Sequence, residues 1–173
     1  MSAPCTIRWT TIGATPGAWR SSQPPMTDLA GQIAELHTQC GLTAWSKKTW
    51  QSFLDSNRCV ILLYLSEDNA QILAACLYQY VADEAELLQI FVHASSRGQG
   101  IGRQLLEASI DLLIIKNILY IYLEVSEQNT PAIGLYSSFG FQEIGVRGGY
   151  YRHQDGSAAD ALQMRFELQP TLA

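Results

Sequence analysis

A cluster of glycines between two apolar segments restricts the possible folds of this chain more than any other stretch. Gly98, Gly100 and Gly102 follow a strand-like run and precede a segment with helical periodicity. Glycine weakens both helices and strands, so this cluster is either a plain flexible turn or a place where the backbone approaches a large ligand closely. An anionic ligand is favoured there, because the first N–H groups of a helix have no partner within the helix.

Two common phosphate-binding motifs do not match this cluster. A P-loop requires a Lys-Ser or Lys-Thr pair after its last glycine, and no such pair follows these glycines. A dinucleotide fingerprint requires a third glycine where Arg103 or Leu105 stands. The remaining pattern is Arg97, two residues, Gly100, one residue and Gly102. Backbone amides and two arginines at the start of a helix suit a pyrophosphate without a metal ion.

The apolar periodicity alternates between the patterns of strands and helices, which predicts an α/β fold with a mixed sheet. The expected elements, each bounded by turn-forming residues or helix caps, are a strand at 6–12, helices beginning at Thr27 or Asp28 and at Ser46, strands at 58–65, 71–81 and 85–93, a helix at 102–116, a strand at 118–125, a helix at 129–140, and strands at 141–152 and 160–168. The strands between 58 and 93 predict an antiparallel meander. The run 118–125 is so continuously apolar that we expect burial on both of its faces.

Composition excludes several classes of function. The 173 residues carry a formal net charge of −5, with 47% hydrophobic and 16% charged residues. These values are typical of a single globular domain over 1–173, of which residues 1–26 form a lead-in that is poorly assigned to elements. They indicate no basic face for nucleic acid. No apolar stretch is long enough to span a bilayer, and no signal-peptide pattern begins the chain.

The four cysteines have neither the spacing nor the neighbouring histidines of a zinc site. They also do not form the dense pattern of a disulfide framework. Reduced thiols in a cytoplasmic protein are therefore expected.

The glycine cluster resembles the acetyl-CoA motif of the GNAT acetyltransferases, which is Gln or Arg, two residues, Gly, one residue, then Gly or Ala. The stretch "RGQGIG" matches this motif, and the expected element order is similar to the family fold over nearly the whole chain. Within the family, "DEAELLQIFV", "LYIYLEVSEQNTPAIGLYSSFGF" and "GGYYRHQDGSAADALQM" resemble segments of the RimI type, which acetylates the N-terminal alanine of a small-subunit ribosomal protein.

The resemblance implies a mixed central sheet of about six to seven strands, splayed in the middle and flanked by helices. Acetyl-CoA would lie in the split as cosubstrate, with its pantetheine arm on strand backbone and its pyrophosphate on the glycine turn. The cofactor-binding residues that the resemblance implies are Ile90, Phe91, Val92, Arg97, Gly98, Gln99, Gly100, Ile101, Gly102, Arg103 and Asn129. Asn129 is equally suited to cap a helix.

Acetyl transfer to an amine requires that the ammonium group lose a proton, that the carbonyl be polarised and that the departing thiolate be protonated. Glu124 stands near the end of an apolar run, where a carboxylate requires a partner, a water or a chemical task. The resemblance makes Glu124 the general base, directly or through a water, and Tyr136 the general acid. It makes the backbone N–H of Val92 or a neighbour the group that polarises the carbonyl. A solvent-facing glutamate and a core tyrosine are the alternatives.

Other residues bear on the acceptor. The acidic side chains of Asp83, Glu84 and Glu86 either attract a cationic peptide or belong to a solvated hairpin. Tyr150 and Tyr151 either form a wall of a peptide groove or pack in the core. Ala44 departs from the RimI-type pattern, which often has proline there, and leaves the identity of the acceptor open.

Three functions are compatible with these residues. The favoured one is an N-acetyltransferase that acts on the N-terminus of a ribosomal protein. The second is acetylation of a small amine such as a polyamine, amino acid or drug, and the third is an acetyl-CoA sensor without turnover. For the first, the expected partners are acetyl-CoA and a protein N-terminus, without nucleic acid or membrane, and the expected state is a monomer or weak dimer.

Overall fold

The computed structural model describes residues 6–11, 20, 27–41, 45–152 and 158–168. The elements of these residues are, in chain order, β1 (Thr6–Thr11), α1 (Leu29–Gln39), α2 (Lys47–Leu54), β2 (Cys59–Leu65), β3 (Ile72–Val81), β4 (Glu84–Val92), the short 3-10 helix η1 (Ala94–Ser96), α3 (Ile101–Ile115), β5 (Tyr120–Ser126), α4 (Thr130–Phe139), β6 (Gln142–Arg152) and β7 (Ala158–Glu167). The α/β order expected from the sequence is confirmed. The rest of the expected lead-in at 1–26, beyond β1 and Arg20, lies outside the described residues.

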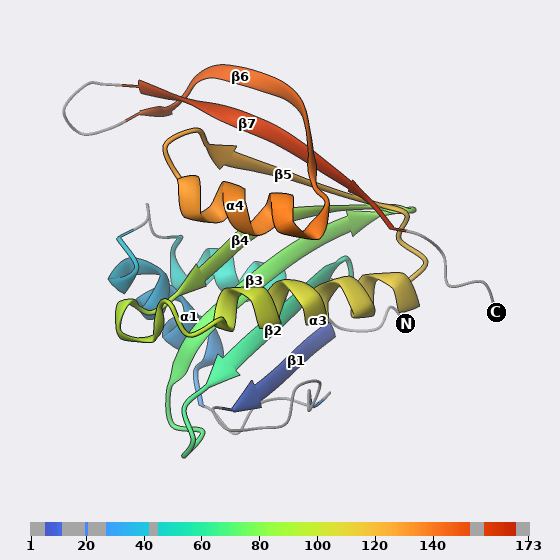
Figure 1. Cartoon of the computed structure of the whole chain (residues 1–173). Coiled ribbons are helices and arrows are strands. Elements are labelled where there is room, and N and C mark those ends of the chain that lie inside the picture. The colour runs from blue at the N-terminus through green and yellow to red at the C-terminus, as the bar shows by residue number, and fades with distance from the viewer. Residues whose placement is uncertain (1–5, 12–19, 21–26, 42–44, 153–157, 169–173) are drawn as a thin grey trace.

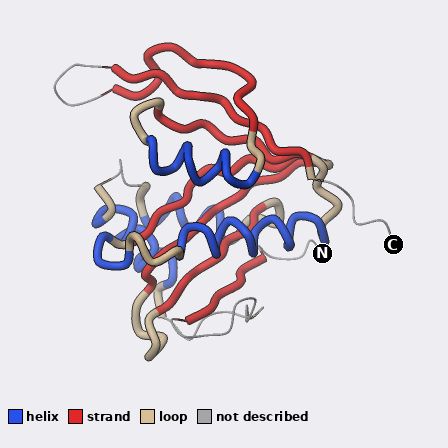
Figure 2. The backbone as a smooth tube through the Cα atoms, in the orientation of Figure 1, coloured by secondary structure: helices blue, strands red, loops and turns tan. Residues whose placement is uncertain are grey.

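The described strands form one seven-stranded sheet in the order β1-β2-β3-β4-β5-β7-β6. The pairs β1 with β2 and β4 with β5 are parallel, and the other neighbouring pairs are antiparallel. Figure 2 shows the strands as a twisted sheet with helices on both sides. The meander of β2, β3 and β4 is confirmed, and so is the parallel crossover through α3.

Side-chain caps set where three of the helices begin. The carboxylate of Asp28 accepts from Gly31 N–H at the start of α1, and the hydroxyl of Ser46 accepts from Thr49 N–H at the start of α2. Asn129 caps α4 in the same way, and Gly140, with φ of 97°, ends it. Each cap satisfies an N–H group that has no partner within the helix.

Two hydrophobic cores lie on the two faces of the sheet. One packs α3 and α4 against the sheet from β2 to β7, and the other packs α1 and α2 against β2, β3 and part of β4. All seven residues of β2 are buried, because helices cover both of its faces. In Figure 1, α3 and α4 lie in front of the sheet and α1 lies behind it.

The expectation that both faces of the run 118–125 are buried is wrong. Residues of β5 alternate between buried and half-buried. Ile121 and Leu123 join the core under α3 and α4, whereas Glu124 points to the opposite face. The reason is that α1 and α2 pack over β2 and β3 and leave that face of β5 to polar side chains.

The sheet opens between its central parallel strands. β4 and β5 are paired only as far as Leu87 and Leu123, although β4 continues to Val92. Leu88 forms a bulge, since Leu87 and Gln89 pair with successive residues of β3. A bulge bends its strand and increases the twist, so β4 turns away from β5 at this point. Figure 1 shows the two strands close together at the right and diverging toward the left, which confirms the splayed sheet.

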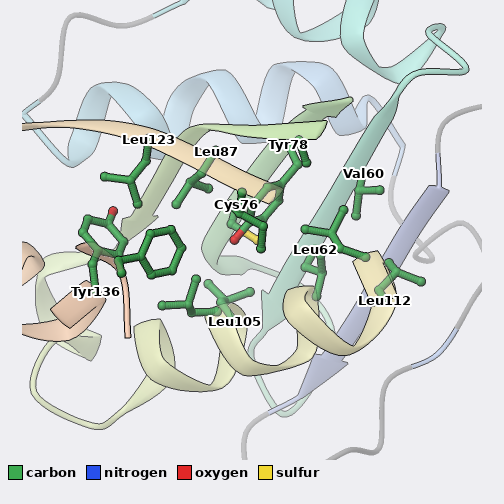
Figure 3. Packing of buried hydrophobic residues seen from close by; sticks show 14 of the residues in the cluster. Val60, Leu62, Cys76, Tyr78, Leu87, Leu105, Leu112, Leu123 and Tyr136 are labelled. Carbon is green, nitrogen blue, oxygen red and sulfur yellow. The ribbon is translucent and has the colours of Figure 1, made fainter. Parts of the chain in front are cut away.

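We predict that Leu105→Ala lowers the free energy of unfolding by about 3 kcal/mol. Leu105 is fully buried on α3 and packs in the core that Figure 3 shows, so truncation leaves a cavity under the sheet. Urea denaturation followed by circular dichroism measures the change. Glu107→Ala, at an exposed position of the same helix, is the matched control. A loss no larger than that of the control would contradict the prediction.

Candidate active site

The glycine turn connects β4 to α3 through η1. Gly98 and Gly100 have φ angles of 76° and 78°, in the left-handed region that residues with a Cβ rarely adopt. A Cβ at either position would meet no atom within 4 Å, so the backbone conformation, not crowding, requires glycine. Gly102 differs, because it lies in the first turn of α3 and a Cβ there would make an ordinary contact of 3.7 Å with Leu135.

The start of α3 has no side-chain cap. Gly100 occupies the N-cap position, and the first hydrogen bond within the helix runs from Gln104 N–H to Gly100 O over 3.0 Å. The other described α-helices each have a side-chain cap, from Asp28, Ser46 and Asn129. The N–H groups at 101–103 precede the first helical bond, and with the helix dipole they form a place for an anion.

Arg97 ties this turn to the end of β4 and to α1. Its Nε donates to Val92 O over 3.1 Å, and its Nη2 donates to Cys40 O over 3.4 Å. Gln99 donates from Nε2 to Ser95 O over 3.2 Å within the turn. Arg97 therefore holds the turn in place, and its side chain is exposed enough to add positive potential beside it.

Two further predicted residues contact α4. Arg103 donates from Nη2 to Ser138 Oγ over 2.7 Å, and its guanidinium lies 4.9 Å from the centre of the Phe139 ring. Asn129 is exposed, and its Oδ1 accepts from Ala132 N–H over 3.3 Å as the cap of α4. Arg103 therefore ties the C-terminal end of α4 to the start of α3, whereas Asn129 only caps the N-terminal end of α4.

Backbone groups of β4 face the split at alternate residues. His93 N–H donates to Leu73 O over 2.8 Å, which sets the hydrogen-bonded pairs between β3 and β4. Alternate residues of an antiparallel ladder point their N–H and C=O groups to opposite sides. Phe91 therefore bonds toward β3, whereas Ile90 and Val92 direct their backbone groups toward the split. The carbonyl of Val92 already accepts from Arg97 Nε and from Cys40 Sγ, so Ile90 and the N–H of Val92 are the groups that offer strand-like hydrogen bonding to a molecule lying there.

The side chain of Phe91 anchors β4 on the face away from α3. It stacks on the buried ring of His37 with ring centroids 4.8 Å apart, and Trp50 packs edge-on against both. His37 Nδ1 accepts from Trp45 N–H over 3.3 Å. Burial lowers the pKa of His37, so the neutral ring is favoured and the residue is structural.

Glu124 lies on β5, one residue beyond the last pair with β4. Its side chain is 21% exposed, and Oε1 accepts from Gln163 Nε2 over 3.1 Å. Nη1 of Arg147 lies 3.5 Å from the same oxygen. The hydroxyl of Tyr151 donates to the backbone carbonyl of Glu124 over 3.4 Å. The carboxylate that requires a partner thus has partners on β6 and β7, which the sequence analysis did not identify.

Tyr136 lies on α4 and is 5% exposed. In Figure 3 its hydroxyl points toward Leu123, the last residue of β5 that is paired with β4. Burial raises the pKa of this hydroxyl well above its ordinary value, and the neighbouring Tyr151 and Cys76 add to the shift. The phenol is therefore protonated at physiological pH and can donate a hydrogen bond.

Glu124 and Tyr136 approach the split from opposite faces of the sheet. Tyr136 belongs to the core under α3 and α4, and Glu124 points from the other side of β5. A molecule in contact with both must therefore pass through the opening between β4 and β5. The structure brings together the glycine turn, the backbone of β4, the carboxylate and the phenol around that opening.

The tyrosine pair considered for the acceptor lies near the end of β6, where Tyr151 reaches the backbone carbonyl of Glu124 and neighbours Tyr136. Tyr150 is 45% exposed and packs edge-to-face on the half-buried Tyr151, with ring centroids 5.2 Å apart. The guanidinium of Arg147 lies 4.2 Å from the centre of the Tyr150 ring. Glu84 lies at the first residue of β4, at the end of the strand away from Val92, and accepts from the Tyr122 hydroxyl over 3.3 Å. Ala44 lies outside the described residues.

The candidate site is built from backbone amides, two arginines, a carboxylate and a phenol. Within the described ranges, no group of three or more His, Cys, Asp or Glu side chains could hold a metal ion. In the same part of the chain, no helix is long and apolar enough to cross a membrane.

We predict that Gly100→Ala destabilises the fold by about 1 kcal/mol, because a Cβ is strained at φ of 78°. Gly102→Ala, two residues later, is expected to be neutral or to stabilise α3 by about 0.5 kcal/mol, since its φ is helical and its Cβ makes only ordinary contacts. Urea denaturation of the two variants beside the unsubstituted protein measures both effects. Equal destabilisation by the two substitutions would contradict the assignment of backbone strain to Gly100.

Comparison with known proteins identifies the family of the chain. The model of the Acetyltransferase (GNAT) family matches residues 30–141. The chain is 34% identical over 137 residues to a [Ribosomal protein bS18]-alanine N-acetyltransferase of Haemophilus ducreyi, which covers 79% of this chain and 92% of that protein. It is 38% identical over 124 residues to the enzyme of the same name from Escherichia coli K12, covering 72% of this chain and 81% of that one.

A solved structure supports the same assignment. The crystal structure of the ribosomal-protein-S18-alanine N-acetyltransferase from Escherichia coli superposes with a TM-score of 0.76 and 31% sequence identity. The superposition covers 85% of this chain and 92% of that one. The sheet with its central split, the matched residues and these relatives together show that the chain belongs to the GNAT family of acetyltransferases and is an N-acetyltransferase.

Proposed function

We propose that this protein transfers the acetyl group of acetyl-CoA to the α-amine of the N-terminal alanine of ribosomal protein bS18, in the cytoplasm. The observation that carries the proposal is the split between β4 and β5, with Glu124 on one face and Tyr136 on the other. The relatives at 34% and 38% identity support the acceptor, because both are named for that reaction.

The chain offers acetyl-CoA a site that fits its chemistry. The uncapped N-terminus of α3 and the glycines at 98 and 100 would receive the pyrophosphate, with Arg97 and Arg103 adding positive potential. The amide-rich pantetheine arm would bond to the backbone of Ile90 and Val92 as an added strand. Phe91 would contribute by anchoring β4, and Gln99 and Ile101 by shaping the turn. This arrangement directs the thioester into the opening of the sheet.

Glu124 would serve as the general base. An ammonium group must lose one proton before nitrogen can attack, and a carboxylate beside the split can accept it directly or through a water. Bonds to Gln163 and Arg147 keep this carboxylate in place on the face that the acceptor would approach. The backbone N–H of Val92, which points into the split, would polarise the thioester carbonyl.

Tyr136 would serve as the general acid on the other face. Its raised pKa keeps the proton on the phenol until the sulfur of CoA gains charge. The hydroxyl would first donate a hydrogen bond to the sulfur and then release its proton as the carbon–sulfur bond breaks. As the carbon–nitrogen bond forms, the acceptor nitrogen would lose its second proton to solvent, which leaves a neutral amide. Tyr136 would recover its proton from the surroundings, and the proton taken by Glu124 would also leave to solvent.

A small-amine acceptor remains the second candidate function. Free CoA thiol released from acetyl-CoA distinguishes the candidates when it is followed with a panel of acceptors. We expect an alanine-started peptide with the N-terminal sequence of bS18 to be consumed at least tenfold faster than spermidine or free amino acids. Faster turnover of spermidine would overturn the proposed acceptor. Tight binding of acetyl-CoA without turnover of any acceptor would favour a sensor.

Paired substitutions test the two chemical roles. We predict that Glu124→Gln and Tyr136→Phe each lower kcat by about 100-fold or more, because each removes one proton-transfer group. The Kd for acetyl-CoA is expected to change by less than about threefold, since the turn and β4 are unaltered. Steady-state kinetics and calorimetric titration provide the two measurements. A variant with an unchanged kcat would remove that residue from the mechanism.

A further inference from the structure

We infer that Gln163 is a positioning residue for Glu124, and that Gly145 is small in order to leave space for the Gln163 amide. The inference rests on the proposed function, in which Glu124 is the base. It concerns the two carboxylate oxygens of Glu124: Oε1, which neighbouring side chains hold, and Oε2, which would face the acceptor.

The three residues form a row across neighbouring strands. Glu124 on β5 pairs directly with Gln163 on β7, and Gln163 pairs on its other side with Gly145 on β6. Directly opposed side chains on one face lie close enough to interact. The amide Nε2 of Gln163 reaches Glu124 Oε1 over 3.1 Å. A carboxylate accepts only, so the amide must present its N–H₂ group to Glu124.

The carbonyl end of the same amide occupies the space over Gly145. A Cβ at that position would lie 2.9 Å from Gln163 Oε1, closer than atoms in contact allow. The register of β6 against β7 shifts between Glu143 and Gly145, and this irregularity places the glycine opposite the glutamine. A residue with a Cβ at this position would force the Gln163 amide to move.

The bonds on Glu124 favour one oxygen. Gln163 and Arg147 both approach Oε1, and among the described residues no partner reaches Oε2. Arg147 is 57% exposed at its side chain, whereas Gln163 is half-buried in the sheet, so the amide is the more rigid of the two restraints. With Oε1 held, Oε2 is the oxygen oriented to take the proton from the acceptor. Orientation of this kind contributes to the rate without changing the chemistry of the base.

Gln163→Leu tests the positioning role. With the fastest peptide of the panel we expect kcat to fall about tenfold, because a hydrogen bond to a charged group is lost. The KM for acetyl-CoA is expected to stay within about twofold, since the glycine turn and β4 are unaltered. Gln142→Leu, at an exposed position of β6, is the matched control and should leave both constants unchanged.

Gly145→Ala tests the same role without touching Gln163. The new Cβ displaces only the flexible end of the glutamine, so the fold is retained while the amide leaves Glu124. We expect a fall in kcat similar to that of Gln163→Leu. In the Gln163→Leu background the alanine has no amide to displace and should add less than about twofold, which makes the pair non-additive.

Substitutions in a Glu124→Gln background separate this inference from the proposed function. If Glu124→Gln lowers kcat, Gln163→Leu should add little to it, because Gln163 acts through Glu124. If Glu124→Gln lowers kcat but Gln163→Leu and Gly145→Ala leave it unchanged, the positioning role is overturned and the proposed base stands. If Glu124→Gln itself has no effect, the proposed function fails, and the inference fails with it. Should Gln163→Leu not fold, Gly145→Ala alone decides.

Discussion

The hydrogen bonding between β4 and β5 sets the position of the opening in the sheet, which we propose holds the substrate. The two strands pair as far as Leu87 and Leu123, and a single extra residue at Leu88 then bends β4 away. Beyond that point Ile90 and Val92 direct backbone groups into an opening, where a continuous sheet would have paired them with β5. The glycine turn, α3 and α4 are arranged around this opening, and so are the carboxylate and the phenol.

The caps distinguish three helices with satisfied first turns from one helix whose first turn is free to bind a ligand. The helices α1, α2 and α4 begin with side chains that satisfy their own N–H groups. Helix α3 begins with Gly100, which has no side chain to cap the first N–H groups. Residues farther along the same helix are fully buried against the sheet. Packing of its middle thus permits its first turn to stay available to an anion. Arg97 and Arg103 hold the turn from both sides through bonds to neighbouring elements.

Features set by local sequence could be predicted, and features set by register could not. The glycine turn, the caps at Ser46 and Asn129 and the alternation of strands and helices depend on neighbouring residues, so the sequence alone indicated them. The bulge at Leu88 arises from pairing with β3, and no residue type in β4 indicates it. The half-exposed face of β5 could not be predicted because it carries Tyr120 and Tyr122. Tyrosine occurs both in cores and on half-exposed surfaces, so these residues do not distinguish the two.

The partners of Glu124 show the same limit. Gln163 lies 39 positions away in the chain and meets the carboxylate only because β5 and β7 pair in one register. The resemblance to a family drew attention to Glu124 and Tyr136, but the structure adds what surrounds them. It also narrows the strand residues with backbone groups toward the opening to Ile90 and Val92, since Phe91 bonds to β3.

The carboxylate on β5 and the phenol on α4 lie on opposite faces of the sheet, and this has an evolutionary consequence. In the proposed mechanism, the donor is bound at the start of α3 and along β4, and the acceptor approaches the face of the sheet that carries Glu124. Mutations on the face that carries Glu124 can accumulate without lowering the affinity for the donor. One fold of this kind can therefore evolve to act on different acceptors while its acetyl donor stays the same.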